Sequence, residues 1–275
     1  MFKVLKPLIA AALIILVCED ASAQYEKPAR PPLPPGMKYD TMRRKDANNW
    51  EFIQVRMPGM SNMPNKQLLS EGTLHNGVLE GGWVEYWETG SPRLVTYYTN
   101  GKKNGICITG DPTGSLEQME SYRDDKLEGP SRLYIPHTGM LLEETYYSEG
   151  LKHGQHTKWY QDHTLQEQAN YVNGKLEGAA IWNYDDGKKS VEYNYHNGML
   201  DGSAAVYFRS GMASEMGQYV NNMQSGHWKE FQQNGNLKEE GEYVNGEKDG
   251  IWKEYDEQGN FVKNIKYKKG VLQKK

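Results

Sequence analysis

This sequence has few cysteines and few aliphatic residues, and it has no surplus of positive charge. Of 275 residues only 2 are cysteine, and Cys18 lies in the N-terminal leader described below, so Cys107 has no partner for an intrachain disulfide in the mature chain. The 32 Lys and Arg residues are outnumbered by 36 Asp and Glu, and a net charge of −4 excludes a broad positive field for nucleic acid. Hydrophobic residues make up 37% of the chain, too few for a conventional core of Leu and Val.

Tyrosine, tryptophan and glycine are plentiful instead. The sequence has 19 Tyr and 7 Trp against 5 Phe, so most aromatic rings carry a polar tip that can reach water while the ring packs. It also has 29 Gly. This composition suits a thin β-structure with many turns better than two layers around an aliphatic core.

A short leader precedes the remainder of the chain. Lys3 and Lys6 come before an apolar run from Leu8 to Val17, and small residues follow at positions 21–23. Ten apolar residues extend only about 15 Å as a helix, half of a hydrocarbon core of roughly 30 Å. Residues 1–23 are therefore predicted to be a cleaved signal peptide, which implies export to the periplasm or cell exterior without stable membrane insertion.

Residues 24–49 form the next segment. Five prolines fall between Pro28 and Pro35, a composition that favours extended polyproline II and cannot build a core. We expect residues 24–49 to be a proline-rich flexible linker.

A period of 24 residues runs through the rest of the sequence, with one step of 25. Tyrosine recurs in register at positions 98, 122, 147, 171, 195, 219, 243 and 267. Glycine recurs without exception at positions 81, 105, 129, 154, 178, 202, 226 and 250. Periodicity of this length indicates a solenoid-like array.

Each unit divides into two predicted strands. Strand A follows the second glycine, as in Trp252 to Tyr255, and strand B alternates in character, as in Leu237, Glu239, Gly241 and Tyr243. Asn-Gly pairs such as Asn245 and Gly246 then reverse the chain into the next unit. The predicted fold is all-β, a single-layer meander of consecutive β-hairpins forming an elongated repeat array.

The unit from Tyr243 to Gly259 resembles the bacterial variant of the MORN repeat. It reads Tyr-x-Asn-Gly, three residues, Gly, then Trp-x-x-Tyr and a later Gly, and the resemblance extends over residues 74–272. The resemblance implies an interaction or scaffold module, and some bacterial relatives are described as antitoxin-like. Export disfavours neutralisation of a cytoplasmic toxin, so an antitoxin or immunity role stays a lesser alternative.

The two ends of the array differ from its middle. Residues 50–74 match an incomplete unit, which predicts an N-terminal cap, and residues 75–275 hold about eight units. Lysines gather after Glu257 on the last strand. Such lysines deter edge-to-edge aggregation, and an anion-binding role is the alternative.

Catalytic and metal-binding patterns are weak. The sequence has no nucleophile elbow, P-loop or paired C-x-x-C motif. His153 and His156 point to opposite faces of a strand, which disfavours a shared metal with His163. Glutamate recurs on one strand face, and in adjacent units the carboxylates should stand about 9.6 Å apart, wider than a retaining glycosidase needs and at the upper limit for an inverting one. These residues are Glu143, Glu167, Glu215 and Glu239. We therefore expect no enzyme activity, no cofactor and no metal.

Two aromatic rows of strand A are the candidate binding residues. Interaction with another protein is the leading hypothesis, and binding of envelope glycan through an exposed aromatic row is the alternative. We expect the Trp row to be exposed and to anchor a ligand, because Trp and Tyr bury large area at little entropic cost. The candidate residues are Trp83, Trp228, Trp252, Phe231 and Tyr255.

Overall fold

The structure is a computed structural model that describes residues 38–58 and 67–273. The predicted signal peptide, residues 24–37 of the predicted linker and the last two lysines lie outside the described residues.

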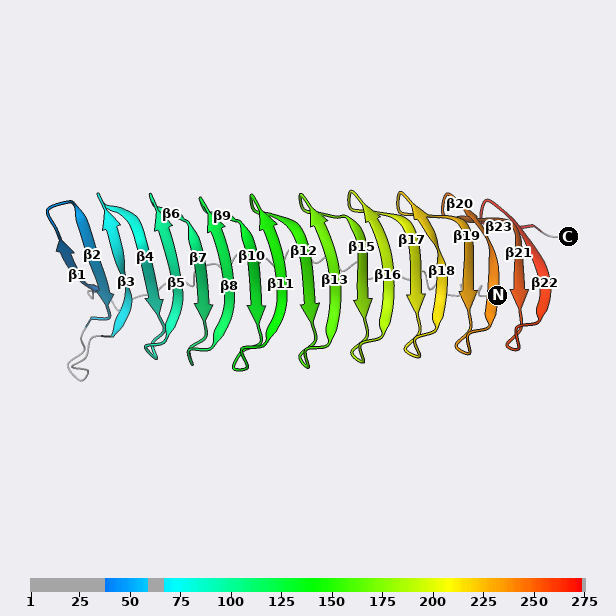
Figure 1. The fold of residues 1–275 in the computed structure, drawn as a ribbon, viewed down its shortest axis with the longest axis horizontal. Helices are drawn as coiled ribbons and strands as arrows, with labels where there is room; N and C mark the ends of the chain where they lie inside the picture. The colour runs from blue at the N-terminus through cyan, green and yellow to red at the C-terminus, as the bar shows by residue number, and fades with distance from the viewer. Residues whose placement is uncertain (1–37, 59–66, 274–275) are drawn as a thin grey trace, which may run out of the picture. The chain divides into compact units, whose positions relative to one another are not determined.

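The described residues form one antiparallel sheet in which the strands follow chain order (Figure 1). The first half contains β1 (Asp40–Lys45), β2 (Trp50–Arg56), β3 (Leu68–His75), β4 (Val78–Tyr86), β5 (Pro92–Thr99), β6 (Lys102–Lys103), β7 (Gly105–Gly110), β8 (Leu116–Arg123), β9 (Lys126–Leu127), β10 (Gly129–Tyr134) and β11 (Leu141–Ser148). The second half contains β12 (Leu151–Trp159), β13 (Leu165–Val172), β14 (Lys175–Leu176), β15 (Gly178–Asn183), β16 (Lys189–His196), β17 (Met199–Tyr207), β18 (Ala213–Val220), β19 (Met223–Phe231), β20 (Leu237–Val244), β21 (Glu247–Tyr255), β22 (Phe261–Lys268) and β23 (Val271–Leu272). The predicted all-β meander of hairpins is confirmed.

Three of the strand A segments are split in two. β5 pairs with both β6 and β7, and Asn104 between them donates its amide to the carbonyl of Tyr97. The same arrangement splits β9 from β10 and β14 from β15. Each pair of pieces is therefore one interrupted strand A.

Left-handed turns join one unit to the next. Asn197 and Gly198 both have positive φ, 52° and 82°, as a two-residue hairpin turn requires. The amide of Gly198 donates to the carbonyl of Leu176 in the preceding unit, and the carboxylate of Glu177 accepts the amide of Asn197. Each turn is thus held by the unit before it.

The second glycine of each unit lies inside strand A rather than before it. Gly202, for example, has φ +113° in the interior of β17, next to a register shift between Tyr193 and Tyr195 of β16. Three residues of β17 there lie between partners that only Asn194 separates on β16, so this is a β-bulge with two extra residues, and the ladder resumes on both sides of it. Strand A therefore begins earlier than predicted, at Met199 in this unit.

At the other end of the hairpins, away from the Asn-Gly turns, side chains form hydrogen bonds between units. Tyr160 donates its hydroxyl to the carbonyl of Asn183, and Tyr184 donates to the carbonyl of Tyr207. Trp87 donates its indole N–H to the carbonyl of Gly110 in the same way. These bonds each join one unit to the next.

The N-terminal end differs from the prediction at β1. Residues 40–45 were expected to belong to the linker, yet each of them pairs with a residue of β2 between Glu51 and Arg56. Arg43 and Lys45 both contact the carboxylate of Glu51, and this ion pairing accompanies the backbone ladder. β2 and β3 form the next hairpin, in which Ile53 and Val55 are buried.

Candidate functional site

Alternation along the strands gives the sheet two distinct faces. The packed face is defined by one strand A position, occupied by Trp83, Cys107, Ser131, His156, Ala180, Ala204, Trp228 and Trp252. The exposed fraction at this position is 3% for Trp228 and 1% for Trp252. The other side, named the solvent face, holds side chains as open as Ile251, which is 58% exposed.

The expectation of an exposed Trp row is therefore wrong. Trp252 packs over Gly241 of β20, where a Cβ atom would lie 2.5 Å from the ring. Trp228 covers Gly217 in the same way, and Trp83 covers Gly72. A missing side chain on the neighbouring strand B gives each indole a place within the sheet.

In the middle of the array the large and small residues change strands, so that alanine occupies the strand A position and tyrosine stands opposite it on strand B. Ala180 and Ala204 both stand opposite Tyr193, which is 4% exposed. A large residue on one strand thus meets small residues on its neighbours. This pairing keeps the packed face filled although the residue types change from unit to unit.

Tyr219, Tyr243 and Tyr267 of the predicted tyrosine column pack on the same face. Edge-to-face contacts, with ring centroids 5.1 to 6.4 Å apart, join Trp182, Tyr193, Tyr219, Trp228, Tyr243, Trp252 and Tyr267 in an unbroken chain. Burial raises the pKa of Tyr193 and Tyr243 well above the ordinary value, which reflects how far both hydroxyls are removed from water. These rings form the core.

Phe231 and Tyr255, the other candidate binding residues, lie on the opposite side from the tryptophans. Both are half-buried. The hydroxyl of Tyr255 donates to Glu240 at 2.8 Å, and its ring contacts Phe261 edge-to-face. Ligand binding by these two residues stays a prediction.

The predicted histidine group is separated by the fold. His156 is buried on the packed face, where its Nδ1 lies 2.7 Å from the hydroxyl of Thr145, and burial lowers the pKa of its imidazole. His163 stacks on Trp159, and His153 accepts the amide of Asn173. Within residues 38–58 and 67–273 no three His, Cys, Asp or Glu side chains are grouped to hold a metal.

The recurring glutamates of strand B have further glutamates beside them on strand A, which the repeat of strand B alone did not reveal. Glu230 and Glu254 of strand A stand directly opposite the predicted residues, which produces the row Glu215, Glu230, Glu239 and Glu254 on four adjacent strands. Lysines contact three of these carboxylates: Lys238 at Glu230, Lys248 at Glu239 and Lys263 at Glu254. Burial and the neighbouring Glu230 raise the pKa of Glu215.

An apolar strip crosses the solvent face near the N-terminal end. Its central row has Val84, Val95, Ile108 and Met119 directly opposite one another on β4, β5, β7 and β8. Tyr97, 53% exposed, and Ile106, 48% exposed, form a second, shorter row on one side of it. The register continues to Glu71 at one end and Arg132 at the other, so charged residues bound the strip.

The 24-residue period does not reveal the apolar strip, because the residue types at its positions differ between units. The column of Ile106 holds Gln155, Ser203 and His227 further along. Only the cross-strand register brings the six apolar side chains of this region together.

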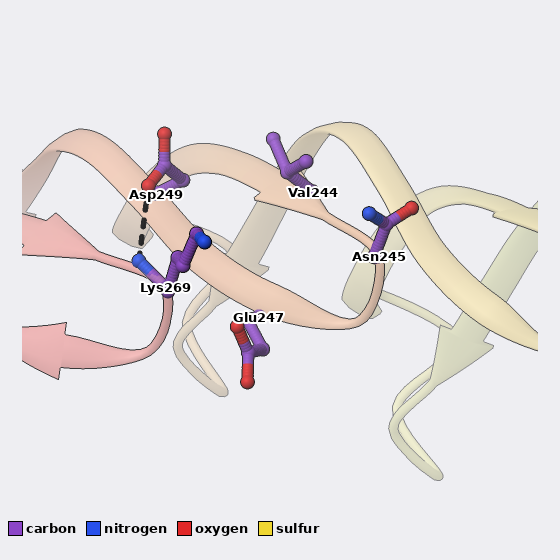
Figure 2. Close-up of a pocket in the computed structure, with 5 residues that line it drawn as sticks. All are labelled: Val244, Asn245, Glu247, Asp249 and Lys269. Atoms are coloured by element: carbon purple, nitrogen blue, oxygen red, sulfur yellow. Dashed lines mark hydrogen bonds between the residues drawn. The ribbon is translucent and has the colours of Figure 1, made fainter.

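A hollow lies between two turns at the C-terminal end (Figure 2). It is lined by Val244, Asn245, Glu247, Asp249 and Lys269, and the amide of Lys269 donates to Asp249 at 3.0 Å. The same bond recurs at Asn197 and Glu177, so the carboxylate serves the turn. The hollow is a product of the repeat.

None of the described residues lies in a helix of the length and apolarity needed to cross a bilayer. No curated protein matches the chain. A similar solved structure is the crystal structure of the GtfA/B complex bound to UDP and GlcNAc, 16% identical over a match covering 59% of this chain and 25% of that chain, with a TM-score of 0.17. A likeness this low carries no argument.

The profile of the MORN repeat variant matches residues 176–197 and 224–245. Each matched segment covers one hairpin and the turn that follows it, from β14 to β16 and from β19 to β20. MORN repeats are generally associated with modules that bind proteins or membranes. The chain carries MORN repeats of the variant type.

Proposed function

We propose that this protein is an exported, non-enzymatic module that binds another protein through the solvent face of its sheet. The observation that supports the proposal is the apolar strip, because a contiguous apolar patch on a domain surface often marks a binding site for another protein. The packed face is occupied by its own rings, so the two faces have different tasks: one holds the array together and the other meets a partner.

Glycan binding through an aromatic row is the alternative, and burial of the tryptophans weakens it. Trp228 and Trp252 are covered within the sheet, which leaves no flat indole row for a sugar to stack on. The hollow of Figure 2 is lined by turn residues whose carboxylate is already engaged. Protein binding therefore has the stronger support.

Site-specific photo-crosslinking in envelope extract tests the proposal. A photoreactive residue is placed at Tyr97, Tyr146 or Ile251, three exposed positions, with half-buried Tyr171 as the matched control. We expect a discrete protein adduct from at least one exposed position and none from Tyr171. Retention on peptidoglycan or polysaccharide, with no protein adduct at any position, would contradict the proposal.

Export is tested separately by the mass of the N-terminal peptide. We expect the mature chain to begin at Gln24, after the small residues at positions 21–23. A chain that retains Lys3 and Lys6 in the cytoplasm would refute export and leave the binding proposal to its own test.

A further inference from the structure

From its dimensions and boundaries, we infer that the apolar strip is a docking site for a single amphipathic helix of a partner protein. This inference rests on the proposed function and specifies its surface. The strip consists of Val84, Val95, Tyr97, Ile106, Ile108 and Met119.

The size of the apolar strip decides between a helix and a broad interface. Four strands span roughly 19 Å, and the two rows of side chains, about 7 Å apart, cover roughly 10 Å along the strands, so the strip covers roughly 200 Å². A stable interface between two globular chains needs about 800 Å² from each partner. The strip is thus too small for a dimer of this chain, whereas a helix about 10 Å wide and about 13 residues long would cover it.

The boundaries of the apolar strip argue against a membrane surface. Glu71 ends the central row on one side, and its carboxylate accepts from Gln54 and Tyr86. Arg132 ends it on the other side, paired with Glu144 at 2.7 Å. Binding to anionic lipid requires a basic rim, and these boundary groups provide no net positive charge.

Surface chemistry matches the apolar face of a helix. Branched and flexible side chains form the row, and Tyr97 gives a ring that stands open beside Gly105, where a Cβ atom would lie 3.6 Å from Tyr97 Cβ. A helix presents apolar residues at spacings of three and four, which place a stripe on such a surface. Glu71 favours a basic residue of the partner at that end.

A matched pair of substitutions tests the site in the full chain. Ile106 and Ile251 occupy the same position of their units and are both exposed, 48% and 58%, but Ile251 stands opposite Lys266 outside the apolar strip. The probe is a fluorescent synthetic 16-residue amphipathic helix of Leu, Lys and Glu, compared with a scrambled peptide of equal composition. We expect Ile106→Glu to weaken binding of the helix at least tenfold and Ile251→Glu to leave it unchanged.

Several results would overturn the inference. Equal binding of the scrambled peptide, or equal effects of both substitutions in variants with unchanged melting temperature, would remove the helix site. Binding to phosphatidylglycerol vesicles that Ile106→Glu abolishes would assign the strip to a membrane, and a dimer in sedimentation that Ile106→Glu dissociates would assign it to a second copy. A protein adduct that survives Ile106→Glu in the crosslinking experiment would refute this site while leaving the proposed function intact.

Discussion

At the residue scale, the stability of the sheet depends on single side chains of the packed face. Trp252 is 1% exposed, lies over Gly241 and has Lys248 Nζ 3.8 Å from its ring centre. We expect Trp252→Ala to lower the free energy of unfolding by about 3 to 5 kcal/mol, because a large buried ring is lost. Urea denaturation measures this, with Ile251→Ala on the solvent face as the control. A loss as small as the control's would contradict burial of the indole.

Gly241 and Trp252 should also be coupled. A methyl group at Gly241 would meet Trp252 at 2.5 Å, so Gly241→Ala should cost about 1 to 3 kcal/mol of stability. In a Trp252→Ala background the methyl has room, and its cost should fall to a few tenths of a kcal/mol. Additive effects in this double-mutant cycle would show that the glycine is required for some other reason.

Glu215 supplies a pH-dependent test. Burial, then the charge of Glu230, raises its pKa in the folded state above the unfolded value, so this carboxylate lowers stability at neutral pH and stops doing so as pH falls. We expect Glu215→Gln to raise the free energy of unfolding at pH 7 by about 0.2 to 1 kcal/mol, the usual size of a cross-strand pair effect, because like charges directly opposite destabilise the sheet. The gain should vanish as the pH approaches about 4, near the ordinary pKa of Glu.

Glu254→Gln is the matched control for Glu215→Gln, because Glu254 has an ion pair with Lys263 at 3.0 Å. It should bring no gain at pH 7. A gain of equal size from both variants, or one from Glu215→Gln that persists at pH 4, would show that the buried charge of Glu215 is not the cause.

At the scale of strands, stability should be local, because each unit bonds only to its neighbours. Gly178 has φ +78° at the start of β15, a conformation that a β-branched residue resists. We expect Gly178→Val to reduce hydrogen-exchange protection in β13 to β16 while β2 to β4 keep theirs. Ala179→Val, the same side chain at an adjacent exposed position, is the control. Uniform loss of protection along the chain would indicate one cooperative core.

Strands and turns followed from the sequence more readily than the faces did. Asn-Gly pairs and the period of 24 residues located the hairpins, since positive φ and strand alternation leave local marks. The burial of Trp228 depends on Gly217 in the neighbouring strand, and one strand's alternation does not say which side is packed. The apolar strip is likewise a product of cross-strand register, so its members, Val84 and Ile108 among them, carry no local signal.

The whole array should tolerate loss of one unit only where volumes still match. Deletion of residues 222–245 would place Trp252 over Gly217, the partner that Trp228 now has, whereas deletion of residues 198–221 would place Trp228 against Tyr193. Both remove 24 residues. We expect the first variant to fold and the second to melt at a lower temperature, as circular dichroism can measure. Equal melting temperatures would contradict volume matching between units.

The turn bonds that tie each unit to the one before it, such as Gly198 to Leu176, have a consequence for distance. Every unit adds two strands, or about 9.6 Å, and needs nothing from any unit beyond its neighbours. A gene that gains or loses one copy of the repeat therefore changes the reach of the array in fixed increments. A docking site on one unit can therefore be placed nearer to or farther from either end of the array, in steps of one unit, without any change to the site itself.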